Sequence, residues 1–272
     1  MGTLTEKIFY ADMSWPETDS AAKSGRVALI PVGSTEQHGP HLPTKTDAFL
    51  AEKICEKAAK KKPSESFVMP TVGYGYNEHH LDFPATIHIN HETMIRFVID
   101  IGKSLAHHGF EKIVLVNGHG SNMAPMEIAS RRITLESNRS LCASLDYLAI
   151  APEVFDQLEG EDAHAGEIET SLMLYLDPDN VDMSKASRDW GFEKSRFINY
   201  GVVPGAKSFG TAGGSVQFMD WWSRMSKTGT MGDPTKSSGE KGKKIFETCS
   251  EKLLQFVEEF RTREIRDRVD HH

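Results

Sequence analysis

The segment from Gly33 to Asp47, GSTEQHGPHLPTKTD, concentrates acidic and imidazole side chains: it holds Glu36, His38, His41 and Asp47. It directly follows the apolar run VALIPV. Carboxylates and imidazoles together form the ligand set that hard and borderline divalent metals select. A solvent-exposed loop has no need of this set, because lysine or serine would serve equally well there. The segment therefore predicts part of a metal site, and other parts of the chain must supply the remaining ligands.

Two further segments hold side chains of the same chemistry. His119 lies in NGHGSN, directly after the apolar run KIVLV, and its flanking glycines allow a tight turn. The segment HAGEIETS places His164, Glu167 and Glu169 at the start of an expected helix. Taken singly, a loop histidine is more often structural, and a carboxylate at a helix start is favoured by the helix dipole. Together, the three segments supply enough ligands for two metals if one carboxylate bridges them.

Strand-like and helix-like segments alternate along the chain, and this order predicts how the three segments are brought together. Short apolar segments indicate buried strands, and longer segments with apolar residues at helical spacing indicate helices. Such alternation predicts an α/β fold with a mostly parallel sheet and helices on both faces. The expected strands lie at 26–32, 66–75, 112–122 and 140–150. The expected helices lie at 46–62, 90–110, 124–137, 164–179 and 239–265.

In a sheet of this kind, functional groups lie beyond the carboxyl ends of the strands. Glu36 and His38 come just after the first expected strand, and their spacing points both side chains the same way in an extended chain. Asp47 begins the next helix, under a Thr-Asp capping signal, and His119 follows a later strand. We therefore expect these side chains to meet at one edge of the sheet.

Composition sets limits on the possible partners. The 272 residues, 39% of them hydrophobic, suit a single domain over 1–272, and no apolar run approaches the roughly 20 residues that span a bilayer. A net charge of −8 and a pI of about 5.8 argue against a nucleic-acid surface. Cys55, Cys142 and Cys249 form no CxxC motif and indicate reduced thiols. We expect a cytoplasmic protein without nucleic-acid or membrane partners.

Three other stretches leave alternatives open. The glycine-rich GTAGGS at Gly210–Ser215 has no lysine at P-loop spacing, so a loop at a subunit contact or over the site is favoured over a phosphate-binding site. The tryptophans of FMDWWSRM pack in an interface or form a wall of the substrate pocket, and both interpretations stay open. The pair at 79–80 is weak as a metal site, because adjacent helix residues diverge.

Five motifs in order resemble the successive signatures of the creatininase (creatinine amidohydrolase) family: PVGSTEQHGPHLPTKTD, GYNEHHLDFPATI, NGHGSN, HAGEIETS and GDPTKSSGEKG. The resemblance runs from about residue 26 to 260. It implies a creatininase-like fold, a homohexamer, and a hydrolytic site with two divalent metal ions per chain, Zn²⁺ and/or Mn²⁺. It places Asp47 as the bridging ligand and His164 as the active-site histidine that handles the proton of the leaving nitrogen. The metal-ligand positions that it implies are Glu36, His38, Asp47, His119 and Glu169.

The chain also departs from creatininase proper. It has Ser121 where creatininase carries a glutamate, and LEGEDAH lacks the tryptophan expected before the HAG histidine. Glu167 is an extra carboxylate and the candidate for a second catalytic group. We therefore expect a pocket that is more polar and more open than one built for creatinine. The candidate substrate-binding residues are Asn77, His80, Gly120 and Ser121.

The resemblance implies a hydrolase in which metal-activated water cleaves a C–N bond of a small polar substrate, which is an amide, a lactam or a formamide. Two alternatives stay open. One is a hydrolase that opens the ring of a cyclic keto-inositol at a C–C bond. The other is a metal-binding member of the family without catalysis.

Overall fold

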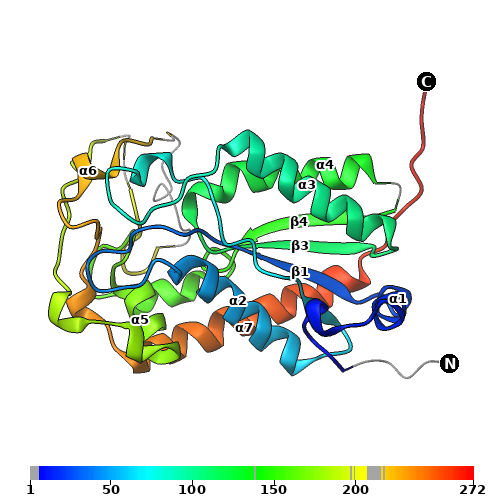
Figure 1. The fold of residues 1–272 in the computed structure, drawn as a ribbon, viewed down its shortest axis with the longest axis horizontal. Helices are drawn as coiled ribbons and strands as arrows, with labels where there is room; N and C mark the ends of the chain where they lie inside the picture. Colours follow the sequence, from blue (N-terminus) through cyan, green and yellow to red (C-terminus); the bar gives the residue numbers. More distant parts are fainter. Residues whose placement is uncertain (1–5, 138, 197, 199, 207–215, 217) are drawn as a thin grey trace.

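The computed structural model describes residues 6–137, 139–196, 198, 200–206, 216 and 218–272 (Figure 1). At its centre, four strands form a parallel sheet in the order β2-β1-β3-β4. The sheet confirms the predicted α/β fold. The loop at Gly210–Ser215 lies outside the described residues. The strands are β1 (Val27–Val32), β2 (Ser66–Val68), β3 (Lys112–Asn117) and β4 (Leu141–Asp146).

Each strand is joined to the next by a helix, which is the connection that parallel pairing requires. The joining helices are α2 (Thr46–Lys61), α3 (His91–His107) and α4 (Met123–Glu136). Every residue of β1 and β3 is buried, because helices cover both faces of the sheet. Successive residues of β1 alternate between the two cores: Leu29 packs on one side, and Ala28 and Ile30 pack on the other.

The helices form two layers, one on each face of the sheet (Figure 1). Helices α3 and α4 pack on one face through side chains such as Val98 and Ile133. Helix α2 lies on the other face with α5 (Glu167–Leu176) and α7 (Gly239–Thr262). The helical spacing of Leu50, Ile54 and Ala58 gives α2 its buried side. The helices cover the two faces of the sheet, and the segments that connect strands to helices lie at its carboxyl edge.

The ends of the helices show which local signals the sequence carries. The Asn90 side chain accepts a hydrogen bond of 2.8 Å from the Glu92 amide and caps α3, and Gly109 follows with φ +88°. The Thr-Asp cap predicted for α2 is wrong, because Lys45 is the N-cap and forms no side-chain capping bond. Asp47 is thereby free to turn its carboxylate toward the edge of the sheet.

Two α-helices among the described residues were not predicted from the sequence. Helix α1 (Trp15–Lys23) begins with a capping box in which Ser14 and Glu17 satisfy each other's backbone amides. The spacing of serine and glutamate, with a proline between them, was a readable signal for it. Helix α6 (Trp222–Met225) is a single short turn. Among the described residues, no helix is both long and apolar enough to cross a membrane.

Candidate metal centre

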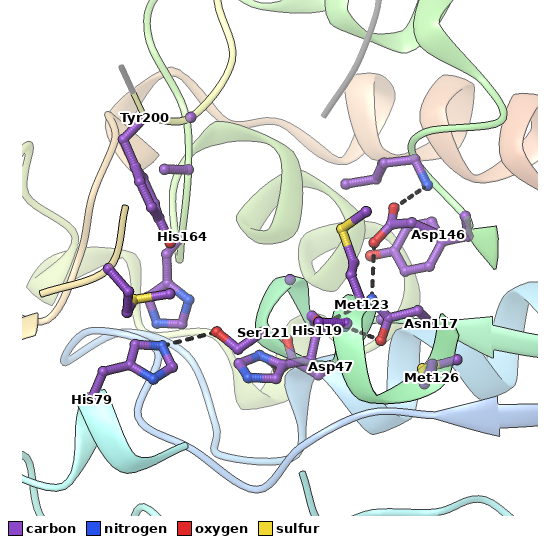
Figure 2. Close-up of a pocket in the computed structure, with 18 of the residues that line it drawn as sticks. Asp47, His79, Asn117, His119, Ser121, Met123, Met126, Asp146, His164 and Tyr200 are labelled. Atoms are coloured by element: carbon purple, nitrogen blue, oxygen red, sulfur yellow. Dashed lines mark hydrogen bonds and ion pairs between the residues drawn. The ribbon is translucent and has the colours of Figure 1, made fainter. Parts of the chain in front are cut away.

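The carboxyl edge of the sheet gathers the side chains that sequence analysis singled out. Glu36 and His38 lie in the segment after β1, and Asp47 lies in the first turn of α2. His119 follows β3 directly, and Glu169 lies in the first turn of α5. Asp47 and His119 lie together in the middle of the pocket in Figure 2. The three segments thus converge on one place, as the positions of their ligands after strands and at helix starts predict.

Asp47 joins two sets of ligand atoms through its two carboxylate oxygens. Asp47 Oδ2 lies 3.1 Å from His119 Nδ1, which lies 3.2 Å from Glu36 Oε1. Asp47 Oδ1 lies 2.9 Å from His38 Nε2, which lies 3.8 Å from Glu169 Oε2. In each set, the three ligand atoms lie within 4.8 Å of one another. The structure therefore brings all five predicted ligands together, with Asp47 common to both sets.

The two histidines of these sets are held with one nitrogen facing the carboxylates. His38 Nδ1 lies 3.1 Å from the backbone oxygen of Glu36, and His119 Nε2 lies 3.1 Å from the backbone oxygen of Tyr76. A carbonyl oxygen only accepts, so each of these nitrogens carries a hydrogen and donates it. In the neutral rings, His38 Nε2 and His119 Nδ1 then present lone pairs to the carboxylates. Metal-binding histidines are oriented in this way.

The electrostatics of the cluster favour a cation. Burial raises the pKa of Glu36 and raises the pKa of Glu169 to about 8. Burial opposes the charged form of His38, but Asp47 and Glu169 outweigh it and raise the pKa of His38 to about 10. Glu36 Oε1 and Asp47 Oδ2 are buried and accept no well-formed hydrogen bond from any described residue. Buried carboxylates need compensating charge, and divalent cations fit this set of oxygen and imidazole donors.

His164 approaches the same cluster from the segment before α5. Its Nδ1 lies 3.5 Å from Glu36 Oε1, and its Nε2 donates to the backbone oxygen of Gln37 at 2.8 Å. Burial lowers the pKa of His164 well below its usual value, which favours the neutral ring. Its Nδ1 also completes a third group of ligand atoms with Glu36 and His38. The proton-transfer role implied by the family resemblance stays a prediction.

The candidate substrate-binding residues fall into two groups. His80, Gly120 and Ser121 line a cavity of about 790 Å³ that opens on the cluster. Asn77 is fully buried and is not among the lining residues. Its side chain donates to Ser34 Oγ, and Ser34 Oγ donates to Glu36 Oε2 at 3.1 Å. The structure thus places Asn77 behind the cluster, where it supports Glu36.

Glu167, the candidate second catalytic group, lies apart from the cluster. One carboxylate oxygen forms an ion pair with Lys241, and the other accepts a 2.9 Å hydrogen bond from the Glu159 amide. Glu167 does not line the cavity. Its observed contacts link the start of α5 to α7, which carries Lys241.

The cavity has an aromatic wall. Tyr200, Phe218 and Trp222 all line it, and Figure 2 shows Tyr200 on the same side as His164. Trp222 is 2% exposed, and its indole N–H donates to the backbone oxygen of Gly229 at 2.7 Å. Trp222 therefore lines the pocket, which was one of the two interpretations left open, whereas Trp221 is not among the lining residues. The tryptophan comes from a later segment than the one compared with creatininase.

Sequence reasoning missed two residues of the site. Asp146 ends β4, lines the cavity, and accepts hydrogen bonds from the Leu148 and Ala149 amides at 2.9 and 3.2 Å. Burial raises the pKa of Asp146 to about 6. Its position at a strand end was a readable signal. Gln37 lies between two predicted ligands, and its contacts reach residues distant in the sequence. No local pattern indicates those contacts.

Comparisons with known proteins agree with this geometry. A model of the creatininase family, described as creatinine amidohydrolase, matches residues 11–257. The creatinine amidohydrolase of Pseudomonas putida is 28% identical over 275 residues, which cover 94% of this chain and 98% of that enzyme. The mycofactocin precursor peptide peptidase of Mycolicibacterium smegmatis is 31% identical over 81% of this chain and 79% of its own length. A 3-dehydro-scyllo-inosose hydrolase from Thermotoga maritima is 27% identical over 94% of this chain and 84% of its own length.

Solved structures give the same result. A mutant creatininase of the Zn-Zn type has a TM-score of 0.76 and 28% identity, with 94% of this chain and 99% of that chain covered. A structure described as creatininase Mn has the same TM-score and identity, with 93% of this chain and 99% of that chain covered. The similarity therefore extends over nearly the whole chain and includes the sheet edge where the cluster lies.

Proposed function

This chain belongs to the creatininase family of hydrolases, and on that premise we propose that it is a dinuclear metal-dependent hydrolase of C–N bonds. Its substrate is a small polar amide, lactam or formamide. One observation carries this proposal: the two oxygens of Asp47 lie in two different sets of ligand atoms, at 2.9 Å from His38 and 3.1 Å from His119. A carboxylate placed in this way suits a pair of metals acting together on one substrate.

Zn²⁺ and Mn²⁺ are the proposed ions. The donor set of carboxylate oxygens and imidazole nitrogens suits both, and solved creatininase structures are described as Zn-Zn type and as Mn. Glu36 and His119 would hold one ion with Asp47, and His38 and Glu169 would hold the other. When bound, such ions supply Lewis-acid chemistry, because they polarise a carbonyl group and lower the pKa of water toward neutrality.

The residues of the chain supply positioning and proton transfer. His164 lines the cavity and is held by its hydrogen bond to the Gln37 carbonyl, so it is placed to carry a proton to the leaving nitrogen. Ser121 Oγ lies 3.0 Å from His79 Nε2 and also lines the cavity, where it can contact polar groups of the substrate. Trp222 adds an apolar surface to the same cavity, with its ring centroid 5.1 Å from that of His164.

The relatives support an amide substrate. Two of the three compared above are, by name, a creatinine amidohydrolase and a peptide peptidase, and both names denote hydrolysis of amide bonds. The third acts on an oxidised inositol, which keeps a keto-inositol as the second candidate. A cavity of about 790 Å³ is within the usual size of small-molecule sites. The homohexamer and the cytoplasmic location stay predictions from the sequence.

A substrate panel tests the proposed function. Protein stripped with a chelator and reconstituted with Zn²⁺ or Mn²⁺ is assayed on creatinine, small lactams, formamides and keto-inositols. We expect hydrolysis of at least one C–N substrate, and we expect chelation to lower its rate about 10³-fold or more, because the metals supply several kcal/mol of transition-state stabilisation. Turnover of keto-inositols alone, or amide hydrolysis that survives chelation, would contradict the proposal. Untreated protein carried through the same buffer exchange is the control.

A further inference from the structure

We propose that His80 donates a hydrogen bond from its Nε2–H to the carbonyl oxygen of the substrate, and that Gln37 holds His80 in the tautomer that makes this donation possible. The proposal rests on the amide hydrolysis proposed above and assigns a separate part of the chemistry. Neither residue belongs to the two sets of ligand atoms joined by Asp47. The inference follows from the hydrogen bonds of one buried side-chain amide.

The two ends of the Gln37 amide are identified by backbone groups. Gln37 Oε1 accepts from the Gly39 amide at 2.9 Å, and Gln37 Nε2 donates to the Gly229 carbonyl at 3.1 Å. A backbone N–H only donates and a carbonyl only accepts, so exchanging the oxygen and the nitrogen would break both bonds. The atom that lies 2.9 Å from His80 Nδ1 is therefore the NH₂ group of Gln37. It can only donate.

A donor facing His80 Nδ1 fixes where the ring carries its proton. Nδ1 must be the acceptor, so a neutral His80 carries its hydrogen on Nε2. A doubly protonated ring would place a second hydrogen against the Gln37 donor, so the geometry requires the neutral ring, and burial likewise lowers the pKa of His80 well below its usual value. Nε2 forms no hydrogen bond with any described residue, and His80 lines the cavity. The Nε2–H of His80 is thus available to donate a hydrogen bond to a group that enters the cavity.

The second imidazole beside Gln37 does not disturb this assignment. His164 Nε2 lies 3.1 Å from Gln37 Nε2, but it lies closer, at 2.8 Å, to the backbone oxygen of Gln37. That carbonyl takes the His164 hydrogen. The two hydrogens of the Gln37 amide are then used by the Gly229 carbonyl and by His80 Nδ1. Every donor in this group has one acceptor.

The ring of His80 is held between the aromatic wall and the metal-ligand cluster. It stacks on Trp222 with the centroids 4.4 Å apart and the planes at 24°. Its centroid lies 4.7 Å from that of His164 and 6.5 Å from that of His119. Trp222 and Gln37 both donate to the Gly229 carbonyl, so this carbonyl fixes the Trp222 ring and the Gln37 side chain relative to each other. A donor fixed in this way, next to the reacting groups, can stabilise the negative charge that develops on a substrate oxygen.

Substitutions of His80 distinguish its hydrogen-bond donation from its stacking on Trp222. His80→Phe keeps a ring that can stack on Trp222 but removes both nitrogens. We expect kcat to fall about 10²- to 10³-fold, as for loss of one oxyanion donor, with KM and the two bound metals little changed. His80→Gln should recover part of the rate, because its amide can present an N–H near the position of Nε2. The matched control is His91→Phe, at the exposed start of α3 and outside the cavity, which should leave kcat unchanged.

The tautomer itself is measured by the nitrogen NMR shifts of the His80 imidazole, without any need for turnover. Wild-type protein should show Nε2 protonated, and Gln37→Met should show a mixture of tautomers and a lower kcat with the metals retained. Protonation at Nδ1 in the wild type overturns the proposal. A His80→Phe protein with wild-type kcat on an amide also overturns it and leaves the proposed function intact. If reconstituted wild type hydrolyses no amide, the proposed function fails, and the donor role of His80 fails with it.

Discussion

Replacement of Asp47 by asparagine should remove both metal ions and abolish hydrolysis. Asp47 Oδ1 and Oδ2 lie 2.9 Å from His38 and 3.1 Å from His119, so one side chain serves both sets of ligand atoms. Asparagine keeps the shape but has no charge, and one of its two terminal atoms is an NH₂ group that cannot bind a cation. We expect bound metal to fall from about two equivalents to well below one, and kcat/KM to fall about 10³-fold or more. Metal analysis and kinetics on the same preparation measure both effects.

Asp146→Asn is the matched control for this change. Asp146 is a buried carboxylate in the same cavity, and it belongs to none of the groups of metal-ligand atoms found among the described residues. Both variants lose one buried negative charge, so a general effect of charge on folding would appear in both. We expect Asp146→Asn to retain two metals. An Asp47→Asn protein that keeps one full equivalent would show that Asp47 serves only one of the two sets.

His119→Ala and His164→Ala should separate metal binding from proton transfer. His119 Nδ1 lies 3.1 to 3.2 Å from the carboxylates of Asp47 and Glu36, so its loss should remove metal and activity together. His164 lies outside both sets that share Asp47, and its loss should leave most of the metal in place. We expect kcat to fall about 10²- to 10⁴-fold in His164→Ala, which is the usual range for general acid–base catalysis. Metal content and kcat of the two variants are compared side by side.

The reverse pattern would contradict the assignment. Loss of metal in His164→Ala would mean that the group of Glu36, His38 and His164 holds an ion. Retention of metal in His119→Ala would remove His119 from the ligands. Thermal unfolding without added metal checks that both variants are folded, because neither result is informative in an unfolded chain.

The sheet could be predicted because its strands carry their own signals. VALIPV and the IVLV of β3 are continuous apolar runs, and such runs are typical of strands buried on both faces. The α2 cap could not be predicted, because Asp47 uses its carboxylate at the cluster and not at its own helix end. A functional site here overrides the local preference of an aspartate for capping.

The convergence of the candidate ligands could also be predicted, since each follows a strand or begins a helix at the same edge of the sheet. What the sequence could not supply were contacts between distant segments. Trp222 lies against His80. Gln37 contacts His80, His164 and Gly229, which lie 43 to 192 positions after it in the sequence. Residue type alone suggested Glu167 as a second catalytic group. In the structure, its carboxylate pairs with Lys241, which lies 74 positions later in the sequence.

The central claim is that Asp47 bridges two metal ions, and anomalous X-ray scattering from crystals of the reconstituted protein tests it most directly. Data collected on either side of the zinc or manganese absorption edge locate the ions independently of activity. The account predicts two anomalous peaks per chain, one beside Glu36 and His119 and one beside His38 and Glu169, with the carboxylate of Asp47 between them. A single peak, or two peaks of which only one contacts Asp47, would contradict it.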